Sequence, residues 1–100
     1  MGLTYDDLAA IQSEIMKGPE RYPVMRGTGG LRKMRIAIKG RGKSGGARVL
    51  YVNYLVYETV YLVSIYAKNV KDNLTPAERN AVKKKLAGIE EDIRRLYSHE

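Results

Sequence analysis

Three apolar segments, joined by short polar loops, occupy the middle of the chain and constrain the fold most strongly. Leu31–Ile38 has apolar side chains at alternate positions, with Lys33 and Arg35 between them, which predicts a half-buried strand with a cationic outer face. Ala47–Val56 is rich in Val and Tyr and predicts a second strand. Thr59–Lys68 is almost entirely apolar and predicts a third, central strand. Because the loops are short, an antiparallel meander is the simplest arrangement.

Helical patterns flank these strands on both sides. Thr4 is a capping residue for a helix that ends at Gly18-Pro19. Thr75-Pro76-Ala77-Glu78 is a second helix start. An apolar stripe at helical spacing follows it: Val82, Leu86, Ile89, Ile93 and Leu96. The sequence therefore predicts a single α+β domain over residues 1–100, with both helices packed on one face of an antiparallel sheet.

Basic charge is concentrated in one part of the chain. Between Arg21 and Tyr57 there are nine Lys or Arg residues and no Asp or Glu, and seven of the ten glycines lie in the same stretch. The net charge of the whole chain is +7. Cations among glycines, which let a backbone approach a ligand closely, favour a polyanionic partner such as a phosphodiester chain.

Several kinds of chemistry are excluded by what the sequence lacks. The chain has no cysteine and a single histidine, His99, so cysteine-ligated zinc, disulfides and a histidine-pair ribonuclease are excluded. The central region has no carboxylates to hold a catalytic metal. Gly42-Lys43-Ser44 is similar to the end of a phosphate-binding P-loop, but Ala37 stands where that motif needs its first glycine. With no membrane-spanning run and no export signal, we expect a cytoplasmic protein.

The remaining possibility is phosphoryl chemistry without metal or cofactor, run by Lys, Arg and Tyr side chains. An RNA 2′-hydroxyl attacks the phosphorus, while the protein aligns it, removes its proton, stabilises the phosphoryl oxygens and protonates the leaving 5′-oxygen. Arginine suits charge stabilisation, and lysine acts as a base only where neighbouring cations lower its pKa. DNA lacks the 2′-hydroxyl, so this chemistry points to RNA. The candidate catalytic residues, if they converge on one sheet face, are Lys33, Arg35, Arg48 and Lys68.

Two segments of the chain, GTGGLRKMRIAIKGRGKSGGARVLY and LVSIYAKNVKDNLTPAE, resemble the RelE/ParE superfamily of toxins from bacterial toxin–antitoxin pairs, most closely its HigB-like branch. The resemblance covers about residues 8–85. It implies a small cytoplasmic toxin that enters the ribosomal A site and cuts messenger RNA there. It also implies a cognate antitoxin, usually a helix-turn-helix protein of the HigA type, through which alone the pair would bind operator DNA.

The resemblance also implies roles for individual residues. Lys33 and Arg35 match the basic pair on the first strand after the glycine turn, and one of them is the expected base. Arg48 matches the arginine that contacts the scissile phosphate, and Lys68 matches the basic residue that ends the last strand. The expected RNA-binding residues are Arg32, Lys39, Arg41 and Lys43.

The chain departs from the family pattern in two places. It opens almost directly into a helix where relatives begin with a short strand. Either that strand is lost or the start is shortened, and in both cases we expect an open sheet edge. Several relatives also place a Tyr or His acid–base group just beyond the last strand, and the segment from Asn69 to Leu74 has neither. We expect the tyrosines of the middle segments to serve packing rather than base stacking: Tyr51, Tyr54, Tyr61 and Tyr66.

Three other functions stay open at the level of sequence. One is a toxin of the same fold that poisons gyrase, which needs no convergent Lys/Arg set. Another is a non-enzymatic RNA-binding protein. The third is a toxin that keeps the fold and has lost its activity.

Overall fold

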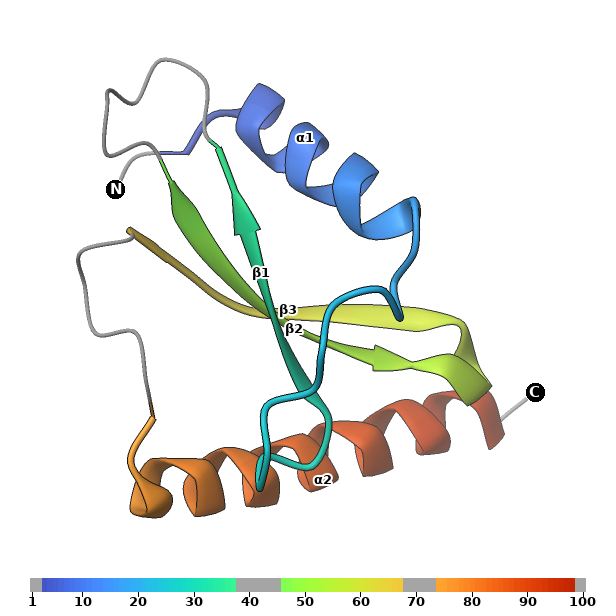
Figure 1. The fold of residues 1–100 in the computed structure, drawn as a ribbon. Helices are drawn as coiled ribbons and strands as arrows, with labels where there is room; N and C mark the ends of the chain where they lie inside the picture. The colour runs from blue at the N-terminus through green and yellow to red at the C-terminus, as the bar shows by residue number, and fades with distance from the viewer. Residues whose placement is uncertain (1–2, 38–45, 68–73, 99–100) are drawn as a thin grey trace.

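The computed structural model of this protein describes residues 3–37, 46–67 and 74–98. Within them, an antiparallel sheet of three strands lies between two helices (Figure 1). In chain order the elements are α1 (Tyr5–Met16), β1 (Leu31–Ile36), β2 (Ala47–Tyr54), the 3-10 helix η1 (Leu55–Tyr57), β3 (Thr59–Ala67) and α2 (Pro76–Ser98). The α+β class and the order of helix, three strands and helix predicted from sequence are confirmed.

The central strand of the sheet is β2. The strand order is β1-β2-β3 with both pairings antiparallel, so the predicted meander is confirmed and the predicted central position of the third strand is wrong. Every β2 side chain except that of Asn53 is buried, whereas the described side chains of β3 are half-buried or exposed. The third strand is apolar because it packs against the margins of two separate clusters, through Val60, Leu62 and Ile65 on one side and Val63 and Tyr66 on the other.

The two helices cover opposite faces of the sheet, so the predicted packing of both on one face is wrong (Figure 1). Successive side chains of a strand point to opposite faces, and in β2 both sets are apolar. Each face therefore needs its own cover. On one face, α1 packs on the sheet through a buried cluster of Ile11, Ile15, Met34, Ala47, Val49 and Tyr51. On the other, α2 packs through a cluster of Leu31, Leu50, Val52, Tyr54 and Leu86.

Two strands end earlier than the sequence pattern indicates. β1 ends at Ile36, and Ile38, the predicted last residue, lies outside the described residues. β2 ends at Tyr54, because η1 makes the reversal of the chain together with Glu58. Glu58 has a left-handed backbone with φ of 50°. The β2–β3 connection is therefore longer than the predicted tight turn of two residues.

Both helices begin at the predicted capping residues. The Thr4 hydroxyl accepts a hydrogen bond from the Asp7 amide (3.1 Å), and the Asp7 carboxylate accepts one from the Thr4 amide (3.0 Å). Thr75 and Glu78 form the same reciprocal pair at the start of α2, at 3.2 Å and 2.8 Å. Such caps satisfy amides that have no partner within the helix, and each contributes about 1 kcal/mol.

The connector between α1 and β1 is fastened to the sheet by two long side chains. The Tyr51 hydroxyl donates a hydrogen bond to the Pro19 carbonyl (2.7 Å). The Arg32 guanidinium donates to the carbonyl oxygens of Glu20 (3.1 Å) and Tyr22. Val24 also forms an isolated antiparallel bridge with Arg32. The outer edge of β1 is thus partly covered by the protein's own connector.

Candidate functional site

A row of three polar side chains crosses the sheet near one end. Arg35 of β1 pairs directly opposite Arg48 of β2, and Arg48 pairs directly opposite Tyr66 of β3. Directly opposed residues project to the same face, with their Cβ atoms about 5 Å apart. This face is the one that α2 covers further along, because Leu50 and Val52 of β2 share it with Arg48. We call Arg35, Arg48 and Tyr66 the cross-strand row.

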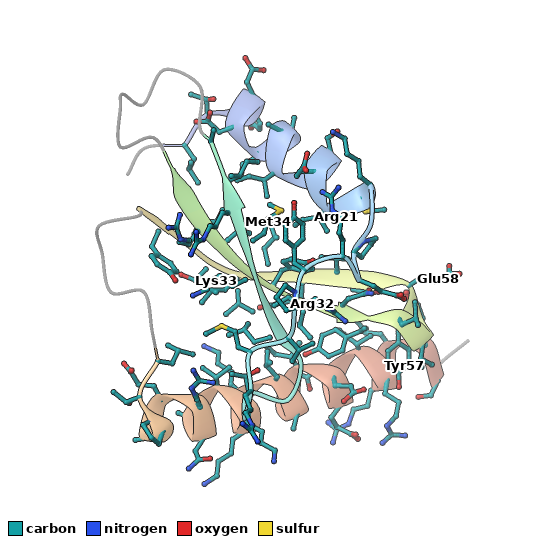
Figure 2. All side chains as sticks on the ribbon, viewed as in Figure 1. Arg21, Arg32, Lys33, Met34, Tyr57 and Glu58 are labelled. Carbon is teal, nitrogen blue, oxygen red and sulfur yellow. The ribbon has the colours of Figure 1, made fainter. Side chains whose placement is uncertain are left out.

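Lys33 lies on the same face, one pair away from the row. It pairs opposite Leu50, which in turn pairs opposite Ser64. Figure 2 shows Lys33 on the side of the sheet that faces α2, with Met34 on the side that faces α1. Three of the four candidate catalytic residues therefore share one face. The fourth, Lys68, follows directly after the last described residue of β3 and lies outside the described residues.

Burial decreases along β1 toward the row. Leu31 is fully buried beneath α2, Lys33 is half-buried and Arg35 is exposed. Arg48, on the central strand, is only 5% exposed. The row thus combines an arginine held in place by packing with one that is accessible to a ligand. Guanidinium groups bind phosphate through parallel hydrogen bonds, so two of them on one face suit a phosphodiester.

The predicted RNA-binding residues do not all gather here. Arg32 pairs opposite Tyr51, so it projects to the α1 face, away from the cross-strand row. Its guanidinium is engaged by the connector carbonyls of Glu20 and Tyr22. The structure gives Arg32 a role in the fold, and its contact with RNA stays a prediction. The other three predicted contacts lie outside the described residues: Lys39, Arg41 and Lys43.

The glycine-rich turn before β1 is packed on α2. The Thr28 side chain is fully buried, donating to the Met25 carbonyl (2.6 Å) and accepting from the Leu31 amide (3.0 Å). Gly29 has a left-handed φ of 78°, and a Cβ there would come within 3.2 Å of the Lys83 side chain. Part of the glycine content that suggested close approach to a ligand therefore serves close approach to a helix.

Two of the tyrosines are structural, as predicted. Tyr51 is fully buried and Tyr54 is 7% exposed, and their hydroxyls donate to the carbonyls of Pro19 and Leu86. Burial raises the pKa of both phenols above the usual 10.0, because the ionised form would be poorly solvated. Both side chains stay neutral over the physiological range.

Tyr66 is the member of the cross-strand row whose alignment with Arg48 the sequence pattern does not predict. The sequence pattern assigns it to packing, and its ring does pack against the margin of the α2-side cluster. Its alignment with Arg48 depends on an irregularity between Leu50 and Tyr51 in the β2–β3 register. Continuing the Tyr51↔Leu62 pairing without it would bring Ile65 opposite Arg48. No sequence signal that we recognise marks this shift.

The described part of the chain also limits other kinds of site. Across residues 3–37, 46–67 and 74–98, no group of three or more His, Cys, Asp or Glu side chains is placed to hold a metal ion. Neither described helix is long and apolar enough to cross a lipid bilayer.

Comparison with known protein families agrees with the fold and with the predicted resemblance. A family model described as RelE, the RelE toxin of the RelE / RelB toxin-antitoxin system, matches residues 8–96. This match runs from α1 to the last turns of α2 and includes the whole sheet with its cross-strand row. The chain therefore belongs to the RelE toxin family, and it is the toxin of a toxin–antitoxin system, a family membership that implies a cognate antitoxin as its partner.

Proposed function

We propose that this toxin is a ribosome-dependent messenger RNA endonuclease of the HigB-like branch, acting in the cytoplasm and silenced by a helix-turn-helix antitoxin. The observation that carries the proposal is the cross-strand row, with Lys33 beside it. Family membership supports the general class, since toxins of this family generally cut RNA. The shared face of Lys33, Arg35 and Arg48 supports a site for one phosphodiester.

The chemistry follows from the side chains on that face. The 2′-oxygen of the nucleotide before the cut forms a bond to phosphorus, and the bond from phosphorus to the 5′-oxygen breaks. A base on β1 takes the 2′-hydroxyl proton, and Lys33 is the candidate, because the exposed guanidinium of Arg35 stays protonated. Arg48 and the neighbouring cations stabilise the charge on the phosphoryl oxygens. The departing 5′-oxygen takes up a proton, so the products are a 2′,3′-cyclic phosphate and a 5′-hydroxyl.

Mapping messenger RNA 5′ ends after induced expression in bacteria tests the proposal directly. We expect new ends in frame with translation for the wild type and a loss of at least about 100-fold in their yield for Arg48→Ala, as for removal of a charge-stabilising group. Lys84→Ala is the matched control, because Lys84 is an exposed cation on α2. It should cut like the wild type. Circular dichroism of both variants shows whether the fold is kept.

The ends of the fragments report the mechanism. Fragments made on purified programmed ribosomes should accept a labelled phosphate from polynucleotide kinase without prior phosphatase treatment, because they start with a 5′-hydroxyl. A single 2′-deoxynucleotide before the cut should abolish cleavage at that position only. Fragments that begin with a 5′-phosphate, or cleavage that continues past the deoxynucleotide, would refute attack by the 2′-oxygen.

The same experiments separate the other functions. A gyrase poison would stop growth without in-frame cuts, and Arg48→Ala would leave its toxicity intact. A non-enzymatic RNA-binding protein would be harmless when overexpressed. A toxin that has lost its activity would produce neither cuts nor growth arrest.

A further inference from the structure

We propose that Tyr66 forms a stacking subsite for a nucleobase next to the scissile phosphate, which rests on the proposed RNA-cutting function and adds to it a second point of contact. The subsite would take the flat face of a base from the nucleotide whose phosphate contacts Arg35 and Arg48. It would be tolerant of base identity, because every base presents a π-face.

The irregular register between β2 and β3 is the first observation behind this proposal. The register shifts at Leu50 and Tyr51, and Val63 on β3 has no directly opposed partner. An extra residue in one strand turns the side chains beyond it to the other face, and such bulges are over-represented next to active sites. Here the shift brings Tyr66 rather than Ile65 opposite Arg48. An aromatic ring thereby occupies the α2-side face beside Arg48, in line with Arg35 on the far side of that arginine.

The second observation is how Tyr66 is held. Its ring is half-buried and packs against the margin of the cluster that contains Leu50. A stacking platform needs support on one side and access on the other, and a half-buried aromatic ring combines the two. Neighbouring strands are about 4.8 Å apart, so the backbone of Tyr66 lies about that distance from the backbone of Arg48. A nucleotide with its phosphate on the arginines can therefore place its base over β3.

The other tyrosines of β2 and β3 do not offer the same arrangement. Tyr51 and Tyr54 are buried, and their hydroxyls are bonded to carbonyls of the connector and of α2. Tyr61 is 42% exposed on β3, but it pairs opposite Val52, toward the other end of the strand from Arg48. Tyr61 is therefore a matched control: the same residue type, on the same strand, outside the cross-strand row.

The test is a cycle that removes the ring and the base separately. Ribosomes are programmed with a messenger RNA of known cut site, either intact or with one abasic nucleotide placed in turn on each side of the cut. Single-turnover cleavage rates are measured for the wild type, Tyr66→Phe, Tyr66→Leu and Tyr61→Leu. The quantity compared is the ratio of the rates on intact and abasic RNA, which a general loss of folded protein does not change.

For the wild type, Tyr66→Phe and Tyr61→Leu, we expect cleavage of intact RNA to be about tenfold faster than cleavage of RNA that is abasic at one of the two positions. Tyr66→Leu should cut both RNAs at the same reduced rate. A ratio near ten for Tyr66→Leu would overturn the stacking subsite while leaving the nuclease proposal standing. Absence of cleavage by the wild type on any programmed messenger RNA would overturn both. A loss of activity in Tyr66→Phe as large as in Tyr66→Leu would assign the role to the hydroxyl and refute stacking.

Discussion

Thr28 shows how one residue can hold a turn in place. Its hydroxyl bonds both the Met25 carbonyl and the Leu31 amide, in a position with no access to solvent. Thr28→Val keeps the shape but leaves two buried backbone groups without this partner, so we expect a loss of about 2 kcal/mol in the free energy of unfolding. Thr28→Ser keeps the hydroxyl and should lose about 1 kcal/mol or less, for the missing methyl group. Urea denaturation measures both. Equal losses would show that the hydroxyl does not hold the turn.

Tyr51 makes a pH-dependent contribution to stability. Its pKa is raised from 10.0 in the folded protein, mainly by burial. Below the unfolded pKa both states hold the proton and the contribution is constant. Above it the unfolded state ionises first, so the free energy of unfolding falls as the pH rises toward the folded pKa. We expect urea midpoints to drop as the pH rises above about 10. The drop should be smaller in Tyr51→Phe, which at neutral pH loses about 1 kcal/mol with its hydrogen bond to Pro19.

The residue scale is also where the sequence predicted least. The alternation of β1 correctly separates Lys33 and Arg35 from Met34. It does not reveal that Arg32 is engaged by carbonyls of a connector ten and twelve positions away. Nor does it predict which face of the sheet Tyr66 projects to, because that depends on one shift of register between β2 and β3. Side-chain partners and registers are set by tertiary contacts, which a local pattern does not encode.

Among the elements, α2 offers a direct comparison of two glycine positions. Gly88 is exposed in the interior of the helix, and a Cβ there would meet nothing within 4 Å. We expect Gly88→Ala to stabilise the protein by about 1 kcal/mol, raising the melting temperature by about 4–8 °C. Gly29, in the turn that packs on α2, has a left-handed φ of 78°, and a Cβ added there would come within 3.2 Å of the Lys83 side chain. Gly29→Ala should therefore lower the melting temperature. Differential scanning calorimetry measures the melting temperatures of both variants. Two shifts of the same sign would contradict the different roles given to Gly29 and Gly88.

Element types were predictable because their signals are local. Both helix starts are fixed by capping pairs three residues apart, and the strands by apolar periodicity and β-branched content. The order of the strands in the sheet was not predictable from the sequence. The side chains of β3 are apolar because they pack against the margins of two clusters, although β3 is an edge strand. The placement of α1 and α2 on opposite faces depends on both faces of β2 being apolar. That could be recognised only once β2 was known to be central.

At the scale of the molecule, the first two strands of the sheet carry positive charge only. Within the described residues, β1 and β2 have no acidic side chain and contain four cations: Arg32, Lys33, Arg35 and Arg48. The acidic side chains lie on the helices and turns, where several are already paired. Glu14 accepts hydrogen bonds from Arg21 (2.6 Å) and Lys17 (3.2 Å), which lower its pKa. Glu91 pairs with Arg94 and Arg95 in the same way. Because the acidic side chains lie away from β1 and β2, the cationic end of the sheet can attract a polyanion.

The salt dependence of RNA binding distinguishes this localised site from a general attraction to a molecule of charge +7. Each phosphate contact to single-stranded RNA adds about 0.7 to the slope of log affinity against log salt concentration, through counterion release. Arg48→Ala should therefore reduce that slope by about 0.7, while Lys84→Ala, which removes the same charge from the exposed face of α2, should leave it unchanged. Fluorescence anisotropy with a single-stranded RNA made uncleavable by a 2′-deoxynucleotide gives both slopes. If the two substitutions lowered the slope equally, binding would follow net charge alone. That result would contradict a localised phosphate-binding site at the cross-strand row.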